Sequence, residues 1–124
     1  MSANMDVALI EATLKELNAS NHEILLSMIV SPDGLTLAYE GQVDEHERVG
    51  ALYIELQLVC EKIMADLKYG QVEEMFIRSR SGCVSMWPIF DKGLLACMST
   101  PKMNANLMQM ATWKTLNKLS KLMI

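Results

Sequence analysis

The strongest constraint on the fold is a tight turn between two apolar segments, within residues 24–41. Pro32 fixes φ at the first corner, the Asp33 side chain can bond its own backbone, and Gly34 supplies a positive φ without a Cβ clash. Residues 24–30 are almost continuously apolar, whereas the segment after the turn alternates apolar and polar side chains. This pattern predicts a β-hairpin whose second strand has one buried face. The residues expected on that face are Leu35, Leu37 and Tyr39.

The length of the chain limits it to one domain. A sequence of 124 residues can bury a hydrophobic core but is too short for two domains of ordinary size, so we expect a single soluble domain over 1–124. No apolar run approaches the roughly 20 residues that cross a bilayer, and the N-terminal segment carries acidic residues instead of a basic leader. We therefore expect no membrane span and no secretory signal. Three cysteines without C-x-x-C spacing favour free thiols in the cytoplasm. They are Cys60, Cys83 and Cys97.

Helical spacing of apolar residues predicts three helices. The first extends through 7–17, the second spans 45–69, and the third begins at Asn104, a good N-cap residue. Asp44 and Glu47 stand where the two polar side chains of a capping box belong, at the start of the second helix.

Three further strands are expected at 72–80, 83–90 and 94–99, with glycine-containing turns between them. Pro88 cannot donate a ladder hydrogen bond and predicts a bulge or an unpaired position in its strand. The element order is then αββαβββα. Five strands in two hairpin-connected groups predict an α+β fold, with one antiparallel sheet covered by helices on both faces.

The second helix is apolar on two sides. The stripe expected to cover the sheet consists of Val49, Leu52, Leu56, Val59, Ile63 and Leu67, widened by Tyr53, Cys60 and Met64. The opposite stripe consists of Ala51, Ile54, Leu58, Ala65 and Tyr69. A monomer would leave this second stripe in water, and its two alanines would let another helix approach closely. We expect it to form a homodimer interface. The alternative is that the first or third helix of the same subunit covers it.

Several of these features together resemble the roadblock family of dynein light chains and bacterial regulators of Ras-like GTPases. They are the turn Ser31-Pro32-Asp33-Gly34-Leu35, the long helix after an acidic cap, the turns Ser81-Gly82 and Asp91-Lys92-Gly93, and Asn104 at the start of the last helix. The resemblance implies a profilin-like sheet that dimerises through its second helix and the following edge strand. That strand corresponds to 72–80 and would add Val72, Glu74 and Phe76 to the interface.

The resemblance also implies a function. Roadblock proteins are mostly non-catalytic platforms: some attach cargo to dynein, and others recruit small Ras-like GTPases or modulate their nucleotide cycle. We therefore expect a non-enzymatic homodimer that binds and regulates a small Ras-like GTPase. Arg48, Glu55 and Lys62, on one flank of the interface stripe, are candidate partner contacts. Two alternatives stay open, namely a structural adaptor in a motor or signalling complex without effect on nucleotide turnover, and a small-ligand sensor.

The sequence contains few groups suited to other chemistry. His22 and His46, with three scattered cysteines, lack the spacing of metal ligands, and no glycine-rich phosphate loop precedes a helix. We expect no catalytic residue, cofactor or metal. Residues 1–74 contain fourteen acids and four bases, a net charge of −10, whereas 75–124 contain one acid and seven bases, a net charge of +6. These bases are too dispersed to predict a nucleic-acid groove.

Overall fold

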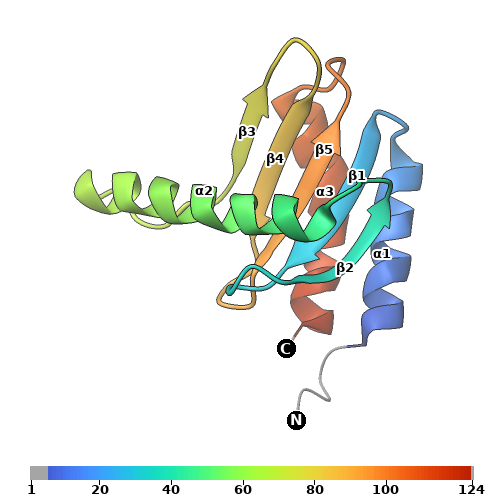
Figure 1. Cartoon of the computed structure of the whole chain (residues 1–124), viewed down its shortest axis with the longest axis horizontal. Helices are drawn as coiled ribbons and strands as arrows, with labels where there is room; N and C mark the ends of the chain where they lie inside the picture. The colour runs from blue at the N-terminus through green and yellow to red at the C-terminus, as the bar shows by residue number, and fades with distance from the viewer. Residues whose placement is uncertain (1–5, 124) are drawn as a thin grey trace.

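The computed structural model describes residues 6–123 as three helices and a five-stranded sheet (Figure 1). The helices are α1 (Val7–Ser20), α2 (His46–Asp66) and α3 (Ala105–Leu122). The strands are β1 (Ile24–Val30), β2 (Thr36–Gly41), β3 (Met75–Arg78), β4 (Cys83–Pro88) and β5 (Leu94–Ser99). This order, αββαβββα, confirms the predicted one. None of these helices combines the length and the apolar character needed to span a membrane.

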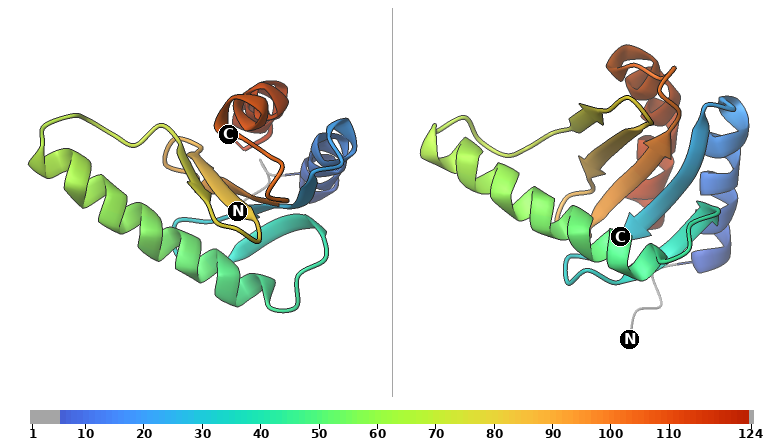
Figure 2. Two further views of the ribbon diagram at one scale, coloured as in Figure 1. Left: turned by 90° about the horizontal axis from the view of Figure 1, so that it is seen from above. Right: turned by 45° about the horizontal axis from the view of Figure 1, so that its top comes forward.

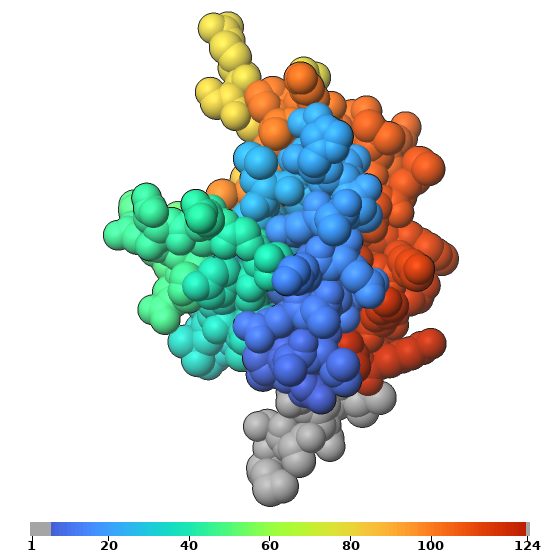
Figure 3. Space-filling view, turned by 90° about the vertical axis from the view of Figure 1, so that its right-hand side faces the viewer, coloured from blue at the N-terminus to red at the C-terminus, as the bar shows by residue number. Residues whose placement is uncertain are grey.

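The sheet is antiparallel throughout, in the order β2-β1-β5-β4-β3, so that β2 and β3 are its edges. Helices α1 and α3 lie side by side on one face, and α2 crosses the other face (Figure 2). In Figure 3, α1 is seen between α3 on one side and β2 with the start of α2 on the other. The predicted α+β architecture, with helices on both faces of one sheet, is therefore confirmed.

Two apolar cores hold these layers together. The core under α1 and α3 buries Ile10, Leu14 and Leu17 of α1 with Met108 and Leu119 of α3. On the surface of this layer, Lys118 donates a hydrogen bond to the Glu16 carboxylate at 2.7 Å, and this bond and the lysine charge lower the pKa of Glu16. The core under α2 is rich in sulfur. Its buried strand residues are Leu26, Met28, Val30, Met86, Leu94 and Ala96.

The hairpin turn forms as predicted. Gly34 has φ +90°, its N–H donates to the Ser31 carbonyl at 2.9 Å, and the Ser31 N–H donates to the Leu35 carbonyl at 2.8 Å. The prediction for the following strand is wrong for Leu35 and Tyr39, which are exposed, whereas Leu37 is half-buried as part of the predicted face and Ala38 is buried. Ala38 packs in the core under α1, which covers this edge strand.

The boundaries of α2 differ from the prediction at both ends. Its N-cap is Glu45, whose carboxylate pairs with Arg48 at 3.1 Å instead of with a first-turn N–H, so the predicted capping box is wrong. The helix ends at Asp66 because Lys68 adopts a left-handed conformation with φ +57°. The Lys68 N–H then donates to the Ala65 carbonyl at 3.1 Å and the Tyr69 N–H to the Met64 carbonyl at 2.9 Å. This Schellman motif stops the helix before Gly70.

Pro88 shortens both strands of the β3–β4 pair. The pairing ends at Met75↔Met86, and its register, if continued, would bring Glu74 opposite Trp87 and then Glu73 opposite Pro88, which has no N–H to offer. Pro88 is paired only on its other side, with Leu94 of β5. The unpaired position predicted at Pro88 is therefore confirmed, and β3 begins at residue 75, three residues later than predicted.

Candidate functional site: the outer face of α2

Three buried residues determine which side of α2 faces the sheet: Gly50, Tyr53 and Ile54. A Cβ atom at Gly50 would lie 3.0 Å from the Thr36 hydroxyl oxygen, so the helix backbone approaches the sheet closely there. The Tyr53 hydroxyl donates a hydrogen bond to the Cys97 carbonyl at 2.8 Å. These contacts lock the rotation of the helix about its own axis.

This rotation differs from the predicted one. Of the stripe expected to cover the sheet, Leu52, Val59, Ile63 and Leu67 are each about half exposed. Its other edge does face the sheet: Tyr53 is buried, and Val49, Cys60 and Met64 pack against the core under α2. The centre of the buried side is rotated from the centre of the stripe by about 100°, which is one residue position. The buried side of α2 includes polar side chains, because the second half of the helix faces the α2–β3 connection instead of the sheet. There the Glu61 carboxylate accepts the Val72 N–H at 2.9 Å.

The outer face of α2 comprises the exposed side of the helix and the residues that follow it. Its large apolar side chains are 51–72% exposed, a concentration well beyond the isolated apolar residues of an ordinary surface. They are Leu52, Leu58, Val59, Ile63, Leu67 and Tyr69. Ala51 and Ala65 add two small exposed side chains. The alternative that α1 or α3 covers this surface is wrong, because both helices pack on the opposite face of the sheet (Figure 2).

The outer face adjoins an open sheet edge. Figure 1 shows the C-terminal half of α2 continuing beyond β3, and β3 pairs with β4 alone within the described sheet. Ala51 neighbours Gly34, so its flank of the helix faces the β1–β2 turn. The opposite flank carries Leu52, Val59 and Ile63. It faces away from the β1–β2 turn, on the side toward which β3 extends from α2 (Figure 1).

The structure places the predicted interface residues in four environments. On the outer face lie Ala51, Leu58, Ala65 and Tyr69. Ile54 and Val72 are buried in the core under α2, so their prediction as surface residues is corrected. Glu74 is exposed, and its carboxylate accepts a hydrogen bond from Gln109 of α3 at 3.1 Å. Phe76 packs half-buried against the core under α1 and α3.

The candidate partner contacts form a charged row. Arg48, Glu55 and Lys62 are all exposed, and their spacing of seven residues places them along one line of the helix. The Arg48 guanidinium pairs with Glu45, whereas Glu55 and Lys62 make no ion pair with any residue in 6–123. Both remain available to a partner.

The cysteines and the potential metal ligands of the described residues are the groups to consider for chemical reactivity. Cys83 and Cys97 are buried, and burial raises the pKa of the Cys97 thiol, which keeps it protonated and unreactive. Within 6–123, no three His, Cys, Asp or Glu side chains converge as a metal site would require.

Replacing Tyr53 with phenylalanine tests how α2 is attached. The change should cost about 1 kcal/mol in the free energy of unfolding at neutral pH, because the Cys97 carbonyl loses its buried donor. Burial raises the pKa of Tyr53 above its ordinary 10.0, so the wild type should lose stability as the pH rises above about 10. The variant should lose less over the same range. Urea unfolding at pH 7 and pH 11 measures both effects, with Tyr39→Phe at an exposed ring as the control. Equal alkaline losses in wild type and variant would contradict this attachment.

Comparison with known proteins agrees with the fold. Residues 9–99 match the Roadblock/LC7 domain family, and no curated protein matches the sequence. MglB of Myxococcus xanthus is 13% identical, with a TM-score of 0.86 over 94% of this chain and 89% of that one. The gliding protein MglB of Thermus thermophilus is 9% identical, with a TM-score of 0.86 over 99% of this chain and 93% of that one.

LokiProfilin1, solved in complex with rabbit actin, is 13% identical, with a TM-score of 0.62 over 95% of this chain and 98% of that one. The sheet is therefore profilin-like, as expected. At these identities the solved structures establish the fold alone, and the family assignment rests on the match that spans most of the chain. The chain belongs to the Roadblock/LC7 domain family.

Proposed function

We propose that this protein is a cytoplasmic, non-enzymatic homodimeric scaffold that binds and regulates a small Ras-like GTPase. The observation that supports this proposal is the outer face of α2, an exposed apolar helix surface beside the open edge of β3. Membership of the Roadblock/LC7 family supports the class of function. The three free cysteines are compatible with a reducing compartment.

In the proposed dimer, the β3 strands of two copies pair antiparallel and the outer faces of the two α2 helices meet. An open strand edge presents backbone N–H and C=O groups that a second copy can satisfy, and a two-fold arrangement lets one patch meet itself. We keep Ala51, Leu58, Ala65 and Tyr69 in this interface. We add Leu52, Val59 and Ile63, because their flank lies on the side toward which β3 runs.

The charged row Arg48, Glu55 and Lys62 lies between the two apolar flanks of α2, so the partner copy would cover it only where the two helices cross. The GTPase would contact the row where the helices diverge from that crossing. The test uses a small Ras-like GTPase from the same organism, loaded with a fluorescent nucleotide. We expect co-elution with the scaffold and a change of about tenfold or more in GTP hydrolysis or nucleotide release. Co-elution with unchanged rates would point to a structural adaptor, and the absence of co-elution would contradict both functions.

The contact surface has its own matched pair of variants. Glu55→Lys should weaken GTPase binding by about tenfold, because it reverses a charge in the proposed contact. Glu11→Lys reverses an exposed helix carboxylate on α1, across the sheet, and should leave binding unchanged. Equal weakening by both variants would indicate a non-specific charge effect and contradict the assignment.

A further inference from the structure

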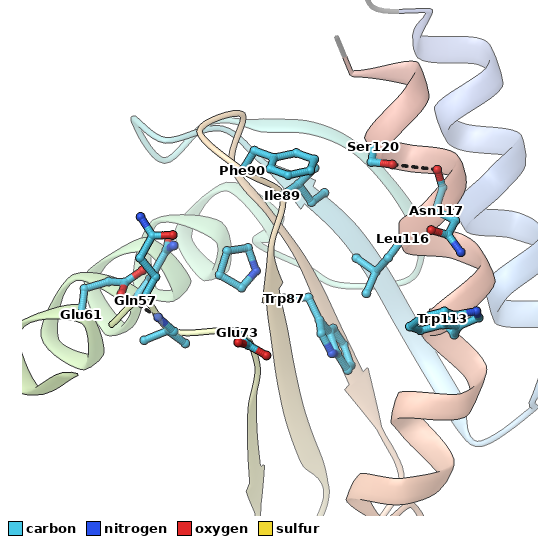
Figure 4. A pocket seen from close by; sticks show the side chains of 13 residues that line it. Gln57, Glu61, Glu73, Trp87, Ile89, Phe90, Trp113, Leu116, Asn117 and Ser120 are labelled. Carbon is cyan, nitrogen blue, oxygen red and sulfur yellow. Dashed lines mark hydrogen bonds between the residues drawn. The ribbon is translucent and has the colours of Figure 1, made fainter. Parts of the chain in front are cut away.

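A groove of about 430 Å³ lies away from the outer face of α2 (Figure 4). It opens where the chain at 71–73 diverges from the end of β4, with α2 on one side and α3 on the other. The early end of the β3–β4 pairing, before Pro88, leaves this part of β4 without a neighbouring strand on that side. The groove therefore opens beside Pro88, where β4 is no longer paired with β3.

Three aromatic rings surround the groove. Trp87 is buried and extends from β4 on the side that faces α3 (Figure 4). Trp113 on α3 and Phe90 after β4 are 70% and 81% exposed. Phe90 also has φ +49°, a conformation that costs a non-glycine residue free energy. The exposure of the Phe90 and Trp113 rings leaves both available for contact.

The charge of the groove is one-sided. Its lining contains the carboxylates of Glu61 and Glu73, and among residues 6–123 no Lys or Arg side chain contributes to it. Glu61 is engaged by the Val72 N–H, whereas Glu73 is exposed and makes no ion pair within the described part of the chain. Aromatic faces attract cations, and a carboxylate can bind a guanidinium through two parallel hydrogen bonds.

We propose that this groove binds an arginine-containing segment of a partner protein. An arginine side chain would stack on Trp113 or Phe90 and pair with Glu73, while its apolar neighbours would cover Trp87. The volume suits a few side chains of an extended segment, and a helix about 10 Å across would not enter it. The groove shares no residue with the outer face of α2 or with β3, so the inference goes beyond the proposed dimer and does not depend on it.

The two tryptophans of the chain both line the groove, so intrinsic fluorescence reports its occupancy. The probe is a tryptophan-free peptide of about ten residues in which arginine alternates with leucine, and the comparison peptide has glutamate in place of arginine. We expect a saturable fluorescence change with the arginine peptide only. A lysine version should bind more weakly, because lysine cannot form the bidentate pair. Equal binding of the arginine and glutamate peptides would overturn the proposal.

Calorimetry with variants locates the site. Trp113→Ala and Glu73→Lys should each lower the affinity for the arginine peptide by about tenfold or more. Both positions are exposed, so circular dichroism should show an unchanged fold. Met110→Ala removes another exposed side chain of α3 outside the groove and should have no effect. The proposal fails if the first two variants bind like the wild type, or if Met110→Ala weakens binding equally. Loss of GTPase binding with peptide binding intact would count against the proposed function alone.

Discussion

Replacing Ile63 with aspartate is expected to convert the proposed homodimer into monomers. The side chain is 51% exposed in the single subunit, on the flank of α2 that faces along β3. In a two-fold interface, the substitution would bury two unpaired carboxylates, and an unpaired buried charge costs several kcal/mol. The dimer dissociation constant should rise at least about 100-fold, equivalent to about 2.8 kcal/mol. Multi-angle light scattering over a dilution series measures the change.

The matched control is Leu9→Asp. Leu9 is 50% exposed on α1, so the substitution has the same chemistry and starting exposure on a helix outside the proposed interface. This variant should remain dimeric. Leu58→Asp tests the flank that faces the β1–β2 turn and should weaken the dimer less than Ile63→Asp. The reverse order would assign the interface to the flank chosen from the sequence, and a monomeric wild type at micromolar concentration would contradict the dimer altogether.

The case of α2 shows what helical periodicity can predict. A period of 3.6 identified a helix with apolar residues on two sides, and both sides exist in the structure. Periodicity did not place the sheet-facing side, which is centred on Gly50, Tyr53 and Ile54 while most large side chains of both apolar stripes stay exposed. The deciding residue was Gly50, which carries no apolar side chain and is unfavourable within a helix. A glycine inside a helical pattern was the signal available in the sequence, and the structure gives its reason, the close approach of the helix backbone to Thr36.

The ends of some strands are determined by local sequence, and the ends of others by the strand they pair with. The bounds of β5 agree with the prediction because the local Asp91-Lys92-Gly93 turn precedes it. The start of β3 could not be predicted locally, because it depends on the pairing of β3 with β4 and on the position of Pro88 in that register. The aromatic groove was not predictable from the chain, because its lining comes from four separate segments. Spacing along the sequence says nothing about their convergence.

Replacing Gly93 with alanine should cause the largest loss of stability, at least about 3 kcal/mol. Gly93 has φ +128°, and a Cβ atom there would lie 2.0 Å from the Val30 carbonyl oxygen. The obstacle is backbone, so no side chain can rotate away. Relief would require β5 to separate from β1 at the Val30↔Leu94 pair, the end of the ladder between two inner strands of the sheet. Urea unfolding at a fixed protein concentration measures the loss, because the stability of a dimer depends on concentration.

Gly70→Ala separates the steric clash from the conformational strain. Gly70 also has a positive φ, +91°, but no described atom lies within 4 Å of a Cβ atom built there. This variant should lose only the strain of the left-handed conformation, about 1 kcal/mol. The difference between the two variants then measures the contact between the β4–β5 turn and β1. Similar losses would show that the sheet absorbs the added carbon, and that the β1–β5 pairing is looser than the close approach at Gly93 implies.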